Sequence, residues 1–190
     1  MKITSGKYKY RNIEVPRGIR PTTEKVREAV FSMIMQWLPD AEVLDLFAGS
    51  GAMGIEALSR GAARCTFVEA NRQNQKVLIS NISNCGAGEE AVVLGRDFEA
   101  ALTEISGRKD KAVFDIVILD PPYEKTDYYT TAMMKLQEYG LIDEGSVVIC
   151  EQLYDNKLSD TCGKLSKFKE KKYGSIGVDL FSVDNSEPFC

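Results

Sequence analysis

The feature that most constrains this chain is a regular alternation of short apolar runs with longer segments of helical periodicity. The apolar runs lie at 42–47, 64–70, 91–95, 113–120 and 146–152. The intervening segments, at 52–61, 71–86, 97–107 and 127–140, have the spacing of amphipathic helices. Strands that alternate with helices are typical of βαβ units, in which the strands are parallel and the helices cover both faces of the sheet. We therefore predict an α/β fold, a Rossmann-like three-layer sandwich with a mostly parallel sheet of about seven strands.

The two ends of the chain depart from this alternation. Residues 2–16 alternate in polarity and contain turn-forming residues, which predicts a small β-hairpin, and a helix should follow at about 23–37. Near the other end, 168–174 and 176–183 predict an antiparallel hairpin on the sheet edge. We expect a hairpin extension at 1–20, one α/β domain at 21–184, and a tail at 185–190.

The composition argues against several classes of site. The chain has no histidine, and none of its five cysteines forms a C-x-x-C pair. A zinc site, a Ser-His-Asp triad and an imidazole base are therefore unfavoured, and we expect no metal. The polar start does not resemble a signal peptide, and no apolar run approaches the ~20 residues of a membrane helix. We expect a monomer in the cytoplasm.

Charge is distributed unevenly along the chain. The formal net charge is −4, yet residues 1–27 hold eight Lys or Arg and only two Glu. A basic arm on an acidic body favours a polyanion at one edge, because lysine and arginine attract phosphates without regard to sequence. A solvated basic face is the plainer alternative. The candidate RNA contacts are Lys7, Lys9, Arg11 and Arg20.

A glycine-rich loop follows the first apolar run. In VLDLFAGSGAMG, the glycines Gly49, Gly51 and Gly54 have the spacing G-x-G-x-x-G between a predicted strand and a predicted helix. Alone, this loop would suit a dinucleotide, with its pyrophosphate at the helix N-terminus. Glu69, ~20 residues further on, could bind a ribose. The loop therefore predicts a cofactor site without identifying the cofactor.

Acidic residues near the ends of three predicted strands favour one cofactor. Asp45 lies in the first strand, Glu69 ends the second, and Asp97 follows the third. These ends meet at one edge of a doubly wound sheet, so the three carboxylates should surround one pocket. They would repel a pyrophosphate but suit the sulfonium, ammonium, ribose and adenine amine of S-adenosylmethionine. The alternative is that Asp97 only caps its helix and that Asp45 is a satisfied buried acid.

The fourth predicted strand ends in Asp120, Pro121, Pro122 and Tyr123. The two prolines fix a rigid, extended turn. The Asp120 carboxylate and the Pro121 carbonyl could accept both hydrogens of an exocyclic amine and orient its lone pair toward a methyl donor. Tyr123 offers a ring on which an extruded base can stack. The alternative is a stiff turn without chemistry.

These motifs carry a family resemblance. DLFAGSG followed by DPPY resembles class I S-adenosylmethionine-dependent methyltransferases that modify exocyclic amines. RPTTEKVREAVF before LDLFAGSGAMGIEALSRGA narrows the resemblance to the bacterial 16S rRNA guanine-N(2) methyltransferases of the RsmD type, over residues 1–151. One departure is Tyr10, where a second hairpin glycine would be expected.

The resemblance implies an activity and roles for individual residues. The activity is methyl transfer from S-adenosylmethionine, giving S-adenosylhomocysteine, to a guanine 2-amino group in 16S rRNA or the 30S particle. Thr22 or Thr23 would close over the donor, and residues 120–123 would hold the target guanine. The remaining donor contacts would be Asp45, Phe47, Gly49 and Gly51 at its amino-acid part, Glu69 at its ribose, and Asp97 and Phe98 at its adenine.

Other functions remain compatible with these residues. The same tetrapeptide would serve methylation of adenine or cytosine in nucleic acid, or of a protein glutamine. A non-catalytic RNA-binding assembly factor could keep the fold, and a dinucleotide oxidoreductase could use the glycine loop.

Overall fold

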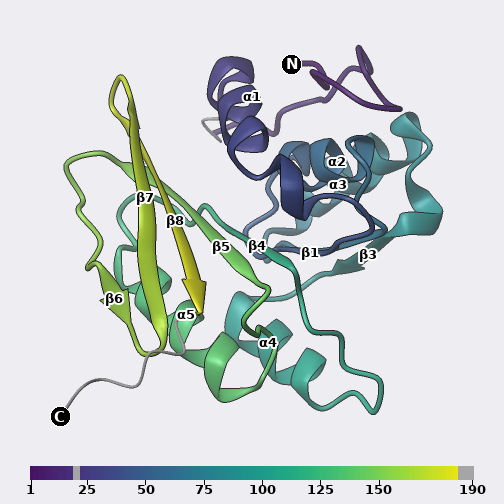
Figure 1. Ribbon diagram of the computed structural model, residues 1–190. Helices are drawn as coiled ribbons and strands as arrows, with labels where there is room; N and C mark the ends of the chain where they lie inside the picture. The colour runs from purple at the N-terminus through teal and green to yellow at the C-terminus, as the bar shows by residue number, and fades with distance from the viewer. Residues whose placement is uncertain (19–21, 184–190) are drawn as a thin grey trace, which may run out of the picture.

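The computed structural model describes residues 1–18 and 22–183 of the 190-residue chain. One mixed sheet of eight strands forms its centre (Figure 1). The strands are β1 (Glu42–Asp45), β2 (Arg64–Val68), β3 (Ala91–Leu94), β4 (Ile116–Leu119), β5 (Val147–Leu153), β6 (Thr161–Cys162), β7 (Leu165–Tyr173) and β8 (Ile176–Val183). The sheet confirms the predicted α/β fold, and β6 is a short strand that the sequence did not indicate.

Helices cover both faces of this sheet. They are α1 (Glu24–Met33), α2 (Ala52–Ser59), α3 (Arg72–Cys85), α4 (Phe98–Ser106) and α5 (Asp127–Glu138), with short 3₁₀ turns η1 (Met35–Trp37) and η2 (Gly88–Glu90). The first three lie on one face of the sheet and α4 and α5 on the other (Figure 1). The first helix is shorter than predicted, because its last residues tighten into η1 before Pro39. None of the helices in the described ranges combines the length and apolarity needed to cross a membrane.

The strand order places a binding crevice between the two halves of the sheet. The order is β3-β2-β1-β4-β5-β8-β7-β6, and the first five of these strands are parallel. The chain moves outward from β1 to β3 and then returns to the other side of β1 with β4. Ligands in such sheets bind at the carboxyl ends of the strands where the order reverses, here between β1 and β4. The chain then reverses direction, so β8 is antiparallel to β5 and to β7.

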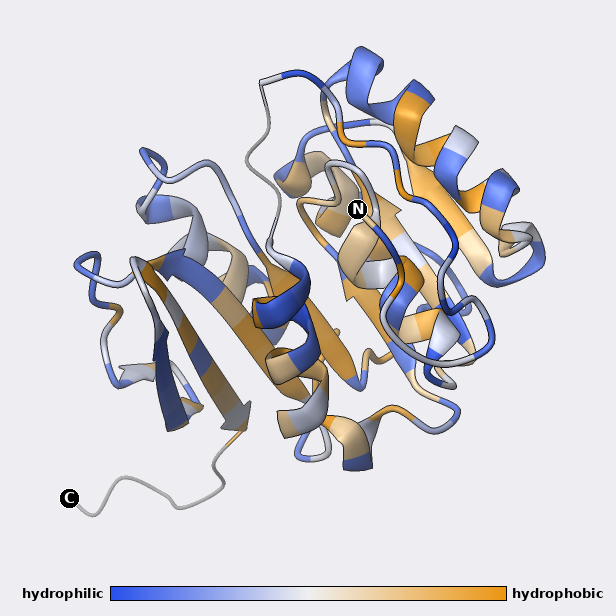
Figure 2. Cartoon of the chain, turned by 90° about the horizontal axis from the view of Figure 1, so that it is seen from above, coloured by the Kyte–Doolittle hydropathy of each residue, from blue (hydrophilic) through white to orange (hydrophobic). Residues whose placement is uncertain are grey.

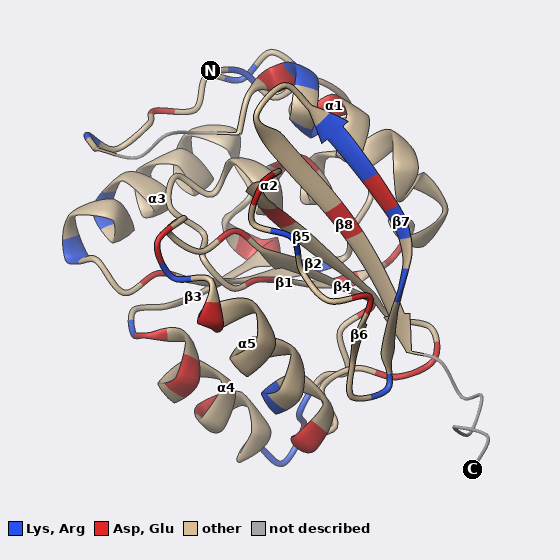
Figure 3. Cartoon of the chain, turned by 90° about the vertical axis from the view of Figure 1, so that its left-hand side faces the viewer, with Lys and Arg blue, Asp and Glu red and all other residues tan. Residues whose placement is uncertain are grey.

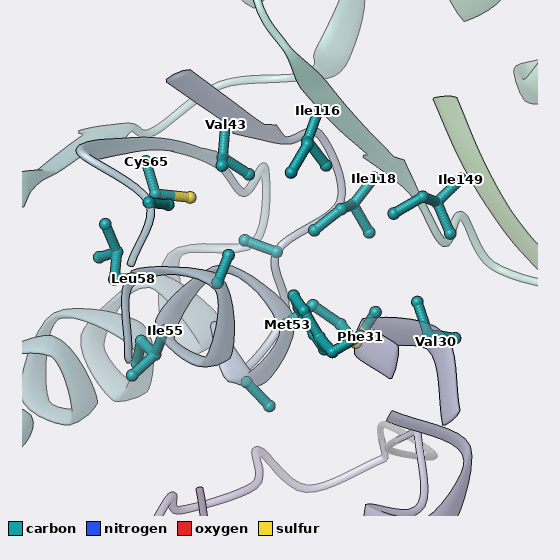
Figure 4. Packing of buried hydrophobic residues seen from close by; sticks show 14 of the residues in the cluster. Val30, Phe31, Val43, Met53, Ile55, Leu58, Cys65, Ile116, Ile118 and Ile149 are labelled. Atoms are coloured by element: carbon teal, nitrogen blue, oxygen red, sulfur yellow. The ribbon is translucent and has the colours of Figure 1, made fainter. Parts of the chain in front are cut away.

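The central strands are buried on both faces, which explains why their sequences are continuously apolar. All four residues of β4 are buried, and the sheet is apolar between its helical layers (Figure 2). Ile116 and Ile118 of β4 pack with Val43 of β1 toward α1 and α2, where Phe31 and Ile55 meet them (Figure 4). This packing fixes the carboxyl ends of β1 and β4 relative to the helices that follow them.

The predicted N-terminal hairpin is present as one antiparallel bridge between Lys2 and Asn12, with tight turns between them. Ile3 is buried in the core of the domain, so the arm packs on the domain. A Cβ at Gly6 would lie 1.7 Å from the Ser59 carbonyl oxygen, so only glycine allows this close approach. Tyr10 has a φ of 71°, in the left-handed region that favours glycine.

A buried ion pair ties the arm to the helices. Arg27 of α1 and Glu56 of α2 form a fully buried pair, with Nε to Oε2 at 3.0 Å. The same carboxylate accepts hydrogen bonds from the backbone N–H groups of Thr4 and Ser5. Because an unpaired buried charge is costly, these contacts hold the arm, α1 and α2 together.

Candidate active site

A pocket of about 720 Å³ opens at the carboxyl ends of β1 to β4. Four loops, those after β1, β2, β3 and β4, supply most of its lining. The predicted residues among its lining are Thr22, Asp45, Phe47, Gly49, Glu69, Asp97, Phe98, Asp120, Pro121, Pro122 and Tyr123. Parallel strands bring these distant segments together because their carboxyl ends share one edge of the sheet.

The glycine loop has two different local requirements. Gly49 lines the pocket and has a φ of 54°. Gly51 does not line it. Gly51 begins α2 with a φ of 79°, and a Cβ there would lie 2.4 Å from Cδ1 of Leu78. Gly54 is constrained in the same way, since its Cβ would lie 2.2 Å from Phe67. These two glycines let α2 pack closely on its neighbours and so position the loop.

Asp45 is a buried acid at the floor of the pocket. It is 2% exposed, and its Oδ2 accepts a hydrogen bond from the Gly54 N–H at 3.0 Å. Burial raises the pKa of Asp45 to about 7, with a smaller contribution from the Glu69 charge, while the Gly54 N–H opposes the rise. A carboxylate of this kind stabilises a cationic ligand group, because the ligand would replace the missing counter-charge.

Glu69 organises the loops on both sides of it. Its Oε2 accepts the Gly49 N–H at 2.8 Å, and its Oε1 accepts the Asn71 N–H at 2.7 Å. Oε1 also lies 3.4 Å from Nδ2 of Asn74. The side chain therefore joins the glycine loop to the start of α3, and it still lines the pocket.

The loop after β3 brings an exposed acid and an aromatic cluster to the pocket. Asp97 caps α4, since its Oδ1 accepts the Ala100 N–H at 2.9 Å. It also lines the pocket, so the capping alternative describes only part of its environment. Phe98 lies 5.3 Å from Phe47 and 4.8 Å from Tyr128 between ring centroids. These three rings form an apolar wall suited to a planar heterocycle.

Asp120 follows β4, on the same edge as Asp45. Burial raises the pKa of Asp120 well above its usual value, and the negative charges of Glu151 and Asp45 raise it further. Pro121 is buried, and Tyr123 is half-buried at the pocket edge. The Tyr123 carbonyl accepts a hydrogen bond from Asn156 Nδ2 at 3.4 Å. The tetrapeptide is therefore held by the sheet on one side and by the loop after β5 on the other.

The structure distinguishes the two predicted threonines. Thr22 is buried, lines the pocket, and donates its hydroxyl to Glu151. Thr23 is exposed and caps α1 by accepting the Val26 N–H at 3.3 Å. Sequence reasoning missed Glu151, although an acid near the end of the fifth apolar run was the same signal that indicated Asp120. It also missed Tyr128, which comes from α5, and Arg96, which lines the pocket beside Asp97.

The predicted RNA-binding residues of the arm lie outside the pocket lining. Lys7 forms an ion pair with Glu90, which directly precedes β3 at the sheet edge where the parallel strands begin. Lys9 lies over the Tyr10 ring at 4.8 Å, and Arg11 is exposed. Arg20 falls outside the described residues. Within the described ranges, no group of three or more Cys, Asp or Glu side chains could hold a metal ion.

Comparison with known proteins identifies the family. A family model described as conserved hypothetical protein 95 matches residues 1–182. The chain belongs to this family. A Bacillus subtilis relative, YlbH, named provisionally as an rRNA methyltransferase, is 34% identical over 95% of this chain and 98% of its own. Ribosomal RNA small subunit methyltransferase D of Escherichia coli is 32% identical over 95% of this chain and 89% of its own. These matches confirm the resemblance to the RsmD type.

A solved structure supports the same assignment. Escherichia coli yhhF, titled provisionally as a methyltransferase, has a TM-score of 0.83 and 30% sequence identity to this chain. The alignment covers 97% of this chain and 98% of that protein. The family likeness therefore includes the N-terminal arm and the antiparallel β7–β8 hairpin as well as the parallel half of the sheet, and the fold is that of class I methyltransferases.

Proposed function

We propose that this protein transfers a methyl group from S-adenosylmethionine to the exocyclic 2-amino group of a guanine in small-subunit rRNA. One observation carries the proposal: Asp120 to Tyr123 line the same pocket as Asp45, Glu69 and Asp97. The acids suited to a cationic donor thus lie next to the tetrapeptide suited to a planar amine. The names of the relatives, which specify small-subunit rRNA, support the choice of substrate.

The donor site fits S-adenosylmethionine by its chemistry. Asp45 would bind the donor's ammonium group, and Glu69 would bind the ribose hydroxyls. Asp97 would accept from the adenine amine, while Phe98 and its aromatic neighbours would contact the ring. The bound donor supplies an activated methyl group on its sulfonium. The carboxylates would hold the donor in the part of the pocket that adjoins Asp120.

Asp120 and the prolines would position the target amine. The carboxylate of Asp120 and the carbonyl of Pro121 would accept hydrogen bonds from the two amine N–H groups and so direct the nitrogen lone pair toward the donor. The high pKa of Asp120 makes its ionised form a strong hydrogen-bond acceptor. Tyr123 would stack on the extruded guanine. This tetrapeptide would serve equally for adenine or cytosine, so the identity of the base rests on the family.

The basic arm would contact RNA away from the target base. Lys9 and Arg11 are exposed and would bind phosphates, whereas Lys7 is already paired with Glu90. The RNA partner would be 16S rRNA, free or in the 30S particle. The enzyme would meet this RNA in the cytoplasm, and we propose that it acts as a monomer.

The decisive experiment is methyl transfer from labelled S-adenosylmethionine to free 16S rRNA and to 30S particles from cells that lack this protein. We expect label in one guanine, mapped by fragment mass spectrometry, with Asp120→Ala protein as the inactive control. Label in adenine, cytosine or protein would assign the activity to another planar amine. Donor binding without transfer to any of these substrates would favour a non-catalytic assembly factor.

A further inference from the structure

We propose that the C-terminal side of the pocket carries a second RNA-contact surface, which we call the C-terminal rim. It consists of Tyr154, Lys157, Lys171 and Lys172. The inference rests on the proposed function, because it assigns the phosphates beside the target nucleotide to this rim. The basic arm, which lies on the α2 and α3 side of the domain, would bind elsewhere on the RNA.

The strand register places the rim at the same sheet edge as the pocket. Gln152 near the end of β5 pairs with Gly177 at the start of β8, and Gly177 pairs with Lys172 at the end of β7. Since β5 is parallel to β4, its end lies on the edge where Asp120 follows β4. The β7–β8 turn therefore projects from the edge at which the substrate would enter. Lys164, in the turn that precedes β7, lies at the opposite edge.

Gly177 of β8 packs closely against Tyr154. A Cβ at Gly177 would lie 3.3 Å from Cα of Tyr154 and 3.5 Å from its Cδ2. Lys172 pairs with Gly177 in the β7–β8 hairpin, and its Nζ lies 4.0 Å from the centroid of the Tyr154 ring. Lys157 approaches the same ring at 3.6 Å. One half-buried aromatic ring thus holds two lysine ammonium groups at the surface.

Hydrogen bonds fix the rim relative to the target-base site. The Tyr154 N–H donates to the Ser175 carbonyl at 2.9 Å, which ties the loop after β5 to the β7–β8 turn. Two residues further along, Asn156 donates to the Tyr123 carbonyl. The rim is therefore connected to the proposed stacking residue through one short loop.

The charges on β7 leave part of the rim available for phosphates. Residues 164–172 contain five lysines and one glutamate, and lysine colour runs along β7 (Figure 3). Lys167 forms ion pairs with Asp160, Glu170 and Asp179. Lys157 forms an ion pair with Glu170. Among the described residues, Lys171 and Lys172 have no ion-pair partner, and both are exposed.

In the described sheet, β6 covers only Leu165 and Ser166 of β7, so the rest of β7 is an outer edge. Exposed lysines on such an edge also discourage pairing with other chains. That role needs positive charge anywhere along β7, and it gives no reason for two ammonium groups on Tyr154 at the pocket edge. The two explanations therefore differ in position along the strand. A comparison of the two ends of β7 separates them.

The test compares Lys172→Glu with Lys164→Glu, which makes the same charge change in the β6–β7 turn, directly before the opposite end of β7. Binding to a 16S rRNA fragment is measured by fluorescence anisotropy between 50 and 200 mM salt, alongside methyl transfer. For Lys172→Glu we expect affinity to fall roughly five- to tenfold at about 0.1 M salt and the salt slope to decrease by about one. Lys164→Glu should match the wild type, and both variants should bind S-adenosylmethionine normally.

Further variants make the result interpretable. Tyr154→Phe should retain RNA affinity, because the ring remains, whereas Tyr154→Ala should weaken it, with calorimetric donor affinity as the check on folding. The rim proposal is wrong if Lys172→Glu binds RNA as tightly as the wild type, or if both lysine variants lose RNA affinity equally. If wild-type protein methylates no rRNA, the proposed function fails instead, and the salt slopes still decide whether the rim binds RNA.

Discussion

The side-chain hydroxyl of Thr22 donates a hydrogen bond to Glu151 at 2.9 Å, across 129 positions of the chain. Glu151 is 3% exposed and lies in β5, beside the strand that leads to Asp120. This contact joins the segment before α1 to the strand next to the proposed target site. Glu151 also raises the pKa of Asp120 through its charge. Glu151 thus both binds Thr22, which lines the pocket, and favours the protonated form of Asp120.

We expect Glu151→Gln to shift the acidic limb of the kcat profile to lower pH. Removing the Glu151 charge lowers the pKa of Asp120, so the ionised form that accepts the amine persists at lower pH. The shift should be about one pH unit, the scale of a close like charge. Thr22→Val keeps that charge and should leave the limb in place. An unshifted profile in Glu151→Gln would show that ionisation of Asp120 does not cause the acidic limb.

Asp120→Ala should abolish most methyl transfer while leaving donor binding intact. The substitution removes one of two acceptors for the target amine, so single-turnover rates should fall by at least ~10²-fold. Asp120→Asn should be intermediate, because its amide oxygen still accepts a hydrogen bond. Calorimetry with S-adenosylmethionine checks the donor site. A normal rate from folded Asp120→Ala protein would reduce the tetrapeptide to a rigid turn.

Glu69→Ala should weaken S-adenosylmethionine binding by about 1–3 kcal/mol, the scale of lost hydrogen bonds to a charged group. Two effects contribute, since the carboxylate would bind the ribose and also accepts the Gly49 and Asn71 N–H groups. Asn74→Ala removes the Nδ2 group that lies 3.4 Å from Oε1 but keeps the Gly49 and Asn71 backbone contacts, so it serves as a neighbouring control. Unchanged affinity in a calorimetric titration of Glu69→Ala would remove Glu69 from the donor site.

Asp45→Asn should stabilise the donor-free protein near neutral pH. The pKa of Asp45 rises from 3.8 to about 7 on folding. Between these values the unfolded chain releases the proton while the folded protein keeps it, so stability falls as pH rises, by at most about 1.4 kcal/mol per pH unit. Asparagine does not titrate and still accepts the Gly54 N–H. Urea unfolding at pH 4 to 8 should therefore show a flatter dependence in the variant, with weaker donor binding.

Charge reversal at Lys9 and Arg11 should weaken RNA binding without changing donor affinity. Both side chains are exposed, so their loss should reduce the salt slope by roughly one unit for each phosphate contact. Lys7→Glu is less informative, since it also breaks the ion pair with Glu90. A salt slope equal to that of the wild type would identify the arm as a solvated basic face.

Much of the candidate site could be predicted because the ends of parallel strands can be recognised in the sequence. Each apolar run ends near the point where its strand leaves the core. An acid lies at or shortly after the end of each of the first four strands: Asp45, Glu69, Asp97 and Asp120. Their meeting in one pocket follows from parallel topology alone. The ring of Tyr128 was not predictable in this way, because it reaches the pocket from a helix whose rotation depends on packing.

The sequence by itself determined the layered fold, the edge of the sheet that carries the pocket, and the residues that follow β1 to β4. It also indicated a basic arm, but the density of charge along the sequence does not predict where on the folded surface that charge lies. Only the tertiary structure decided that Lys7 pairs with Glu90 at the edge opposite the pocket, and that Lys172 lies at the pocket edge. The reason is physical: apolar periodicity is imposed locally by burial, whereas the partner of a surface charge depends on how distant segments pack.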